Sequence, residues 1–196
     1  MLEIILVRHG ETDSNIRGTY CGWTDAQLNE KGRAQAERAA EMLKAEKLDA
    51  IYSSPLKRAF GTASIINQVH DIQIMTDEKL KEQNFGEWED LTYCEITEKY
   101  PEECLNWKKD WMNYCIKGGE SPALVYQRVS GFVDTIAQVH KKGTVLIVTH
   151  LGCIRIILAH LLGMNMEGFW RFKADNGSVS RLAIDDGYAY LKSLNI

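Results

Sequence analysis

The strongest indication of the fold is the segment Leu2-Glu3-Ile4-Ile5-Leu6-Val7-Arg8-His9-Gly10-Glu11-Thr12. Residues 2–7 are too apolar to alternate with polar ones, a pattern typical of a strand buried on both faces in a parallel sheet. His9 follows at the carboxyl end of this strand, between an arginine and a glycine, where it is placed to meet an anion. We therefore take His9 as the centre of a candidate active site.

The chain after this stretch alternates predicted helices and strands. A helix begins at Leu28, with Asn29 as its N-cap, and leads back to a strand over residues 49–52. Ser54 is expected to cap a second helix with Pro55 in its first position, which places Arg58 in the first turn. A third short strand covers residues 72–75. This order of elements predicts a doubly wound α/β sheet.

The second half of the chain extends the same pattern. Thr92 and Glu95 predict a capping box, and Pro101 divides the helical segment that follows, so we expect two short helices in an insertion at about residues 92–117. A long amphipathic helix begins at Ser121-Pro122. Residues 144–149 form the second strongly apolar strand, which ends in His150 and passes directly into a helix over residues 151–162.

Residues 178–184 and 188–194 are expected to pair as a hairpin at the edge of the sheet, because Asp186-Gly187 is a turn signal. The predicted architecture is one domain over residues 1–196. It is a three-layer αβα, doubly wound, mostly parallel sheet with an antiparallel edge, and the helical insertion lies over the site.

The composition is that of an ordinary globular protein. Of 196 residues, 45% are hydrophobic and 26% are charged, which excludes a disordered or fibrous chain. The net charge of -4 argues against a basic surface for nucleic acid or acidic lipid. No stretch approaches the roughly eighteen continuous apolar residues that cross a bilayer, and Met1 leads into a strand rather than a signal segment. We expect a cytoplasmic protein with a small-molecule partner.

The cysteines are odd in number and form no C-x-x-C pair, so we expect reduced thiols rather than a disulfide framework or a zinc site. Cys153 lies just past His150 and is a second candidate nucleophile, although a small core residue is the simpler interpretation. The sequence has no H-E-x-x-H or similar spacing of ligands, so neither a metal nor another cofactor is expected.

His9 and His150 both follow predicted strands, and ligands of open α/β sheets bind beyond the carboxyl ends of the strands. If the two strands are neighbours, both imidazoles face one crevice with Arg8 and Arg58, and helix N-termini add further N–H groups. Each residue alone has an ordinary structural interpretation. Together they predict a pocket for a dianionic phosphoryl group.

The motifs also resemble a known family, the histidine phosphatase superfamily of phosphoglycerate-mutase-like proteins, over almost the whole chain. The matching residues are Arg8-His9-Gly10-Glu11-Thr12, Asn15, Gly22-Trp23-Thr24-Asp25, Leu28, Gly32, Ser53-Ser54-Pro55, Arg58, Thr62-Ala63, Glu82, Phe85-Gly86-Glu87-Trp88-Glu89, Gly119-Glu120-Ser121 and Thr149-His150-Leu151-Gly152.

This resemblance implies that His9 is a nucleophile that forms a phosphohistidine, which water then hydrolyses. A neutral His9 needs its other ring nitrogen to donate to a backbone carbonyl. The resemblance also implies that Glu82 is the proton donor to the leaving alcohol and then the base for water. Arg8, Arg58 and His150 would hold the phosphoryl oxygens. Substrate binding would fall to Asn15, Cys21, Gly22 and Leu151.

Several functions remain open. Hydrolysis is favoured over phosphoglycerate mutase chemistry, because Glu82 is followed by Gln83-Asn84-Phe85-Gly86 rather than the Arg-His-Tyr-Gly of the mutases, and because the insertion is short. The branch that the chain resembles most includes α-ribazole 5'-phosphate phosphatase of cobalamin synthesis, although Asp90 replaces a glycine that is usual there. A sugar-phosphate phosphatase, a broad phosphomonoesterase and a catalytically silent binding module are the alternatives.

The leaving alcohol is expected to meet the stretch between Tyr93 and Ser121. Trp107, Trp111 and Tyr114 either contact an apolar leaving group or simply form part of the core.

Overall fold

A computed structural model describes the whole chain, residues 1–196, and contains one six-stranded sheet in the order β3-β2-β4-β1-β5-β6. The strands are β1 (Leu2–Arg8), β2 (Ala50–Ser53), β3 (Ile74–Thr76), β4 (Gly143–Thr149), β5 (Val179–Asp185) and β6 (Tyr188–Ser193). The first four are parallel, whereas β5 runs antiparallel to β1 and forms a hairpin with β6. The predicted mostly parallel sheet with an antiparallel edge is confirmed.

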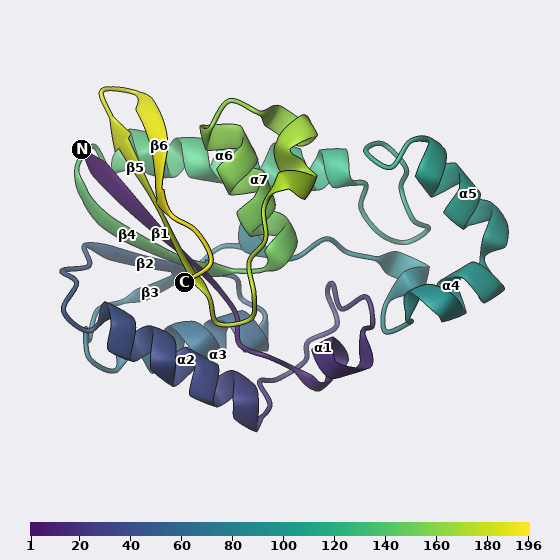
Figure 1. Cartoon of the computed structure of the whole chain (residues 1–196), viewed down its shortest axis with the longest axis horizontal. Coiled ribbons are helices and arrows are strands. Elements are labelled where there is room, and N and C mark those ends of the chain that lie inside the picture. The colour runs from purple at the N-terminus through teal and green to yellow at the C-terminus, as the bar shows by residue number, and fades with distance from the viewer.

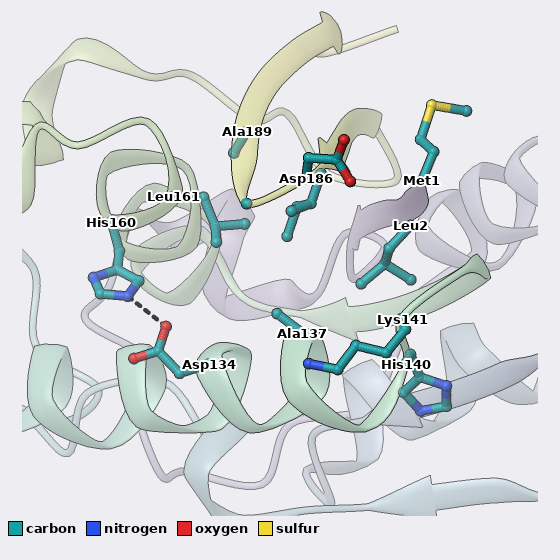
Figure 2. Close-up of a pocket in the computed structure, with 12 residues that line it drawn as sticks. Met1, Leu2, Asp134, Ala137, His140, Lys141, His160, Leu161, Asp186 and Ala189 are labelled. Atoms are coloured by element: carbon teal, nitrogen blue, oxygen red, sulfur yellow. Dashed lines mark hydrogen bonds and ion pairs between the residues drawn. The ribbon is translucent and has the colours of Figure 1, made fainter.

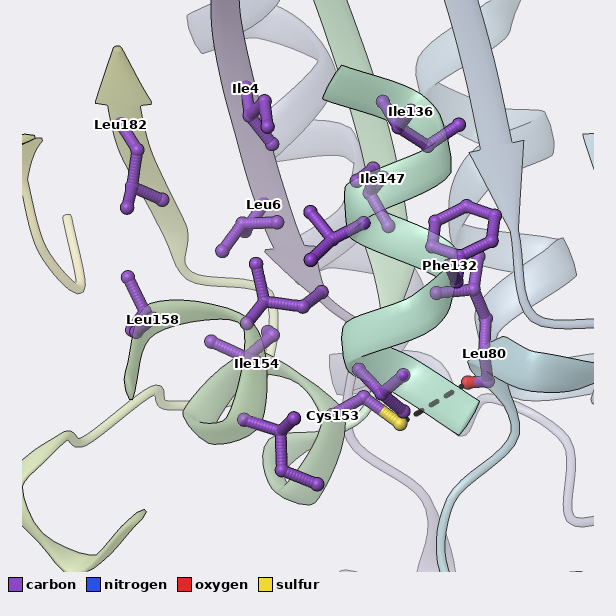
Figure 3. Close-up of a cluster of buried hydrophobic side chains, with 14 of the residues drawn as sticks. Ile4, Leu6, Leu80, Phe132, Ile136, Ile147, Cys153, Ile154, Leu158 and Leu182 are labelled. Atoms are coloured by element: carbon purple, nitrogen blue, oxygen red, sulfur yellow. Dashed lines mark hydrogen bonds between the residues drawn. The ribbon is translucent and has the colours of Figure 1, made fainter. Parts of the chain in front are cut away.

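Helices cover both faces of this sheet (Figure 1). α2 (Glu30–Leu43) and α3 (Lys57–Asn67) pack on one face, and α6 (Pro122–Val139) and α7 (Leu151–Leu161) pack on the other. Each face of the sheet carries a cluster of buried apolar side chains. Alternate residues of β1 belong to one cluster and to the other, so that the whole apolar run of the strand is buried. Figure 3 shows the larger cluster, in which Phe132 of α6 and Ile154 of α7 lie against the sheet.

The local signals explain most of the helix boundaries. The Asn29 side chain accepts from the N–H of Gly32 at the start of α2, and Ser121 accepts from the N–H of Leu124 at the start of α6. Both caps were expected from the sequence, because such side chains satisfy N–H groups that have no partner in the first turn.

The expected cap at Ser54 is wrong. α3 begins two residues later than predicted, at Lys57, and its N-cap Leu56 makes no side-chain hydrogen bond. Ser54 Oγ instead accepts from the N–H of Leu56 (3.3 Å), a local bond that competes with helical capping. Ser54 therefore stays at the end of β2, facing the site, while Arg58 still falls in the first turn.

The insertion consists of α4 (Tyr93–Lys99) and α5 (Pro101–Lys109), which lie together at one end of the molecule (Figure 1). The predicted capping box at Thr92 and Glu95 is present. A small separate cluster of Trp88, Ile96, Cys104 and Ile116 holds the insertion together. The short helix α1 (Asp13–Arg17), which carries Asn15, was not predicted.

No helix of the structure combines the length and the apolar composition that a membrane span requires.

Candidate active site

His9 lies at the carboxyl end of β1 and is 4% exposed. Its Nδ1 atom is 2.7 Å from the carbonyl oxygen of Gly10. Because a carbonyl only accepts, Nδ1 carries the ring proton and Nε2 keeps its lone pair. Burial, together with the charges of Arg58 and Arg8, holds the pKa of His9 well below its ordinary value. The imidazole is therefore neutral, as a nucleophile must be.

His150 follows β4, and its ring centroid lies 5.0 Å from that of His9. Its Nε2 atom lies 2.8 Å from Ser54 Oγ, while its Nδ1 atom is buried without a partner. The hydroxyl of Ser54 accepts from the N–H of Leu56, and its own proton has no acceptor in the chain other than Nε2, to which it is therefore donated. This arrangement makes Nδ1 the protonated nitrogen, free to donate to an anion. Burial and the charge of Arg58 hold the pKa of His150 well below its ordinary value.

The two predicted arginines, Arg58 and Arg8, differ in their hydrogen-bond partners. Arg58 is 1% exposed and donates to the carbonyl oxygens of Thr24 (2.8 Å), Cys21 (3.1 Å) and Gly22 (2.6 Å). It fixes the loop that forms one wall of the site. Arg8 donates once, to Ala174 (2.7 Å), and its buried Nε atom has no partner. Arg8 thus keeps donors for an anion, and Arg58 places a positive charge behind the histidines.

A cavity of about 230 Å³ opens at His9. Six of the nine predicted site residues line it: Arg8, His9, Asn15, Cys21, Glu82 and Leu151. Asn15 lies on α1, its Oδ1 atom accepts from the Thr12 N–H (3.0 Å), and Leu151 is the first residue of α7, where the N–H has no partner within the helix. Arg58 and His150 are buried and do not line the cavity.

Gly22 was also predicted to bind the substrate. It does not line the cavity, and its N–H donates to Glu89 (3.1 Å). A Cβ atom at this position would meet the carbonyl oxygen of Gln83 at 2.0 Å, so close packing requires the glycine. Its contact with substrate stays a prediction.

Glu82 faces the cavity from the loop after the 3₁₀ helix Glu78–Leu80. Its carboxylate accepts from the N–H of Gln83 (3.0 Å) and from the N–H of Gly152 (3.1 Å) in the first turn of α7. A Cβ atom at Gly152 would lie 2.4 Å from Oε1, so a side chain there would displace this carboxylate from its present position. The loop and the helix together point Glu82 at the site.

A second cavity, of about 280 Å³, adjoins the first and shares Tyr20, Glu82, Phe85 and Leu151 with it. We call it the aromatic cavity, because its wall is mainly aromatic and apolar. The remaining lining residues are Gln83, Trp107, Trp111, Pro122, Gly152, Arg155, Phe169 and Trp170. Trp107 and Trp111, two of the candidate contacts of an apolar leaving group, thus line this cavity. Tyr114 packs on Trp88 instead, with ring centroids 6.4 Å apart.

Several residues of the aromatic cavity were not predicted, among them Phe169, Trp170 and Arg155. Phe169 and Trp170 belong to the 3₁₀ helix Asn165–Arg171, and both pack on Trp111, at 5.5 Å and 5.4 Å between centroids. Arg155 of α7 lies over both rings. The adjacent aromatics Phe169-Trp170 in a short stretch between two elements were the only available signal.

His140 and His160 lie away from this site. The largest cavity, about 490 Å³, lies between the β5–β6 turn and the carboxyl ends of α6 and α7, and it contains none of the predicted site residues (Figure 2). His140 and His160 line it and are bound by Tyr52 (3.0 Å) and by Tyr126 (2.9 Å). No three histidine, cysteine, aspartate or glutamate side chains are grouped to hold a metal ion.

Cys153 is a core residue, as expected. It is buried in the larger apolar cluster (Figure 3), and burial raises the pKa of its thiol to about 12. Because the thiolate is the reactive form, this thiol is inert at neutral pH. All five cysteines are free: Cys21, Cys94, Cys104, Cys115 and Cys153.

Comparisons with known proteins show the family of the chain. The model of the histidine phosphatase superfamily (branch 1) matches residues 4–196. Phosphoserine phosphatase 1 of Hydrogenobacter thermophilus is 37% identical over 196 residues, 100% of this chain and 93% of that protein. The adenosylcobalamin/alpha-ribazole phosphatase of Salmonella typhimurium is 32% identical over 194 residues, 99% and 96% of the two chains. The crystal structure of the alpha-ribazole phosphatase from Shigella flexneri aligns with a TM-score of 0.94 at 30% identity, covering 99% and 96%.

Proposed function

Since the chain belongs to the histidine phosphatase superfamily, we propose that it hydrolyses a small phosphomonoester through a phosphohistidine formed on His9. The observation that carries the proposal is the hydrogen bond from His9 Nδ1 to Gly10, which leaves a neutral Nε2 lone pair at a cavity that also holds Arg8 and Glu82.

In the first step, His9 Nε2 attacks phosphorus and the P–O bond to the alcohol breaks. Glu82, in its protonated form, gives its proton to the departing oxygen. Arg8 and His150 Nδ1 donate to the phosphoryl oxygens, and the nearby charge of Arg58 offsets the negative charge of the transition state. Asn15 and the N–H of Leu151 complete the cradle.

In the second step, water attacks the phosphohistidine. Glu82, now a carboxylate, takes the proton of the water, the P–N bond breaks and phosphate leaves. His9 and Glu82 return to their starting states, so the cycle needs neither a metal nor another cofactor.

The aromatic cavity supports α-ribazole 5'-phosphate as the candidate substrate. Its apolar rings suit a flat aromatic base, and the cavity adjoins Glu82, where the leaving oxygen would depart. The named α-ribazole phosphatases among the relatives agree with this choice.

A second candidate is a phosphate ester of a carboxylic acid, such as phosphoserine. Arg155 favours it, because its Nε atom donates to Phe172 (2.9 Å) while its two terminal nitrogens form no hydrogen bond within the chain and the residue lines the aromatic cavity. A guanidinium fork binds a carboxylate with two parallel hydrogen bonds. The phosphoserine phosphatase among the relatives agrees with this alternative.

A comparison of kcat/KM for α-ribazole 5'-phosphate, phosphoserine and phosphoethanolamine distinguishes the two. The last two esters differ only in the carboxylate. The first candidate requires α-ribazole 5'-phosphate to be the best substrate. The second requires phosphoserine to exceed phosphoethanolamine, with the difference lost in Arg155→Met.

Release of phosphate from none of a broad panel of monoesters, with His9→Ala behaving as the wild type, would contradict the proposal and indicate a silent binding module. Transfer of phosphate between 3-phosphoglycerate and its bisphosphate would instead favour a mutase.

A further inference from the structure

Arg128 of α6 binds the loop that carries Glu82, although it lines neither active-site cavity. Its Nη1 atom donates to the carbonyl oxygens of Lys79 (2.7 Å) and Lys81 (2.6 Å), and its Nη2 atom donates to the carbonyl oxygen of Glu82 itself (3.0 Å). Three carbonyl groups of one short loop are thus held by one guanidinium.

The remaining donors of Arg128 bind Glu120. Nε donates to Oε1 (2.9 Å) and Nη2 donates to Oε2 (3.0 Å), a bidentate ion pair whose side chains are only 17% and 19% exposed. All five N–H groups of the guanidinium are therefore used within the chain. None remains for a substrate.

Glu120 extends the same contact to the far side of Glu82. Its Oε2 atom accepts from the N–H of Asn84 (2.9 Å), and its carbonyl oxygen accepts from the side chain of Gln83 (2.7 Å). The Arg128–Glu120 pair thus binds the loop on both sides of Glu82, at residues 79, 81, 82, 83 and 84.

We propose that Arg128, paired with Glu120, is a positioning residue that holds Glu82 in reach of the leaving oxygen. The inference rests on the proposed function, because it takes Glu82 as the proton donor. A donor must lie within hydrogen-bond distance of the oxygen that it protonates, and small displacements cost large factors in rate. A positive charge at position 128 is not sufficient for this role, because the bonds to Glu120 and to the loop carbonyl oxygens depend on the planar fork of the arginine guanidinium.

The test is the leaving-group dependence of Arg128→Met, measured as kcat/KM, which reports the steps up to release of the alcohol. An alkyl phosphate needs a proton donor, whereas 2,4-dinitrophenyl phosphate releases a stable anion without one. We expect a loss of about 100-fold for glycerol 2-phosphate, within the range of general acid catalysis, and no loss for the dinitrophenyl ester. Glu82→Gln should show the same selectivity.

Three further variants make the result specific. Arg128→Lys keeps the charge but not the fork, and Glu120→Gln weakens the ion pair, so both should lose activity selectively on the alkyl ester even if Arg128→Met fails to fold. Arg181→Met is the matched control, because Arg181 is 19% exposed, close to the 17% of Arg128, and is bound by two carboxylates, Glu3 and Glu46, far from the site. It should lower stability without changing the ratio of the two substrates.

Equal losses on both esters in the Arg128 and Glu120 variants, or no loss on either, would overturn the positioning role. Failure of the proposed function would look different, because the wild type would then hydrolyse neither ester.

Discussion

The surroundings of His9 favour a neutral imidazole, which is also the state that the proposed nucleophilic attack requires. The side chain is buried and lies near Arg58 and Arg8, so a charged imidazolium is disfavoured, while the Gly10 carbonyl fixes the tautomer of the neutral ring. His150 is neutral for the same physical reasons. Two neutral histidines side by side leave the positive charge of the pocket to the arginines, which stay charged.

Burial of two neutral histidines predicts a loss of stability in mild acid. Below about pH 6.5 the unfolded chain binds a proton at each histidine, whereas the folded chain does not, because both folded pKa values are lowered. The free energy of unfolding should therefore fall as the pH drops below about 6.5, by at most about 1.4 kcal/mol per pH unit for each histidine. Above that pH these residues contribute no dependence.

Urea unfolding at about pH 7.5 and about pH 5.5 measures this effect. His9→Asn should lose less stability than the wild type between the two pH values, since one of the two groups is gone. His140→Asn is the control, because His140 lies in the cavity at the other end of the sheet. If His9→Asn kept the pH dependence of the wild type, His9 would not be neutral in the folded protein.

Among the elements, the insertion and the 3₁₀ helix Asn165–Arg171 close the aromatic cavity from two sides. Trp111 follows α5, and Phe169 and Trp170 follow α7, yet their rings are in contact. The cavity wall therefore depends on two segments that are far apart in the sequence. These segments are not joined to each other by strand pairing or by helix pairing.

Trp111→Ala should open this wall. We expect KM to rise about tenfold for a substrate with an aromatic leaving group, consistent with loss of one aromatic contact and its buried area, and to change little for phosphoethanolamine. Steady-state kinetics on both substrates measure the effect. Tyr93→Ala is the matched control, because Tyr93 is an exposed aromatic of the insertion outside the cavity. Equal changes in KM for both substrates would exclude a role for this wall in choosing the alcohol.

The elements that the sequence predicts well are those with local signals. Buried strands, the caps at Asn29 and Ser121 and the capping box at Thr92 depend on neighbouring residues alone. The cap at Ser54 was wrong because its hydroxyl binds the N–H of Leu56 and also His150, which is 96 residues away and cannot be read from the neighbouring sequence. Arg155 and Arg128 have no local signal, and Phe169 has only its aromatic neighbour Trp170, since the partners of these residues lie in other segments and only the folded chain brings them together.

For the whole molecule, the parallel pairing of β1 with β4 is what creates the site. Their register places Arg8 opposite Thr149, so the next residues, His9 and His150, leave the sheet side by side. The sequence indicated two apolar runs that each end in a histidine, but left open whether the two strands are neighbours. The sheet order that makes them neighbours depends on packing across the entire chain.

In the proposed mechanism, this pairing makes His9 the acceptor of the phosphoryl group. Turnover of 2,4-dinitrophenyl phosphate can be quenched without acid, because phosphohistidine is labile in acid, and the peptides then analysed by mass spectrometry. Glu82→Gln should accumulate the intermediate, since it lacks the base for water. We expect one added phosphoryl group on the peptide that contains His9, absent in His9→Ala. A phosphoryl group on any other residue, or turnover that persists in His9→Ala, would contradict the role of His9 as the phosphate acceptor.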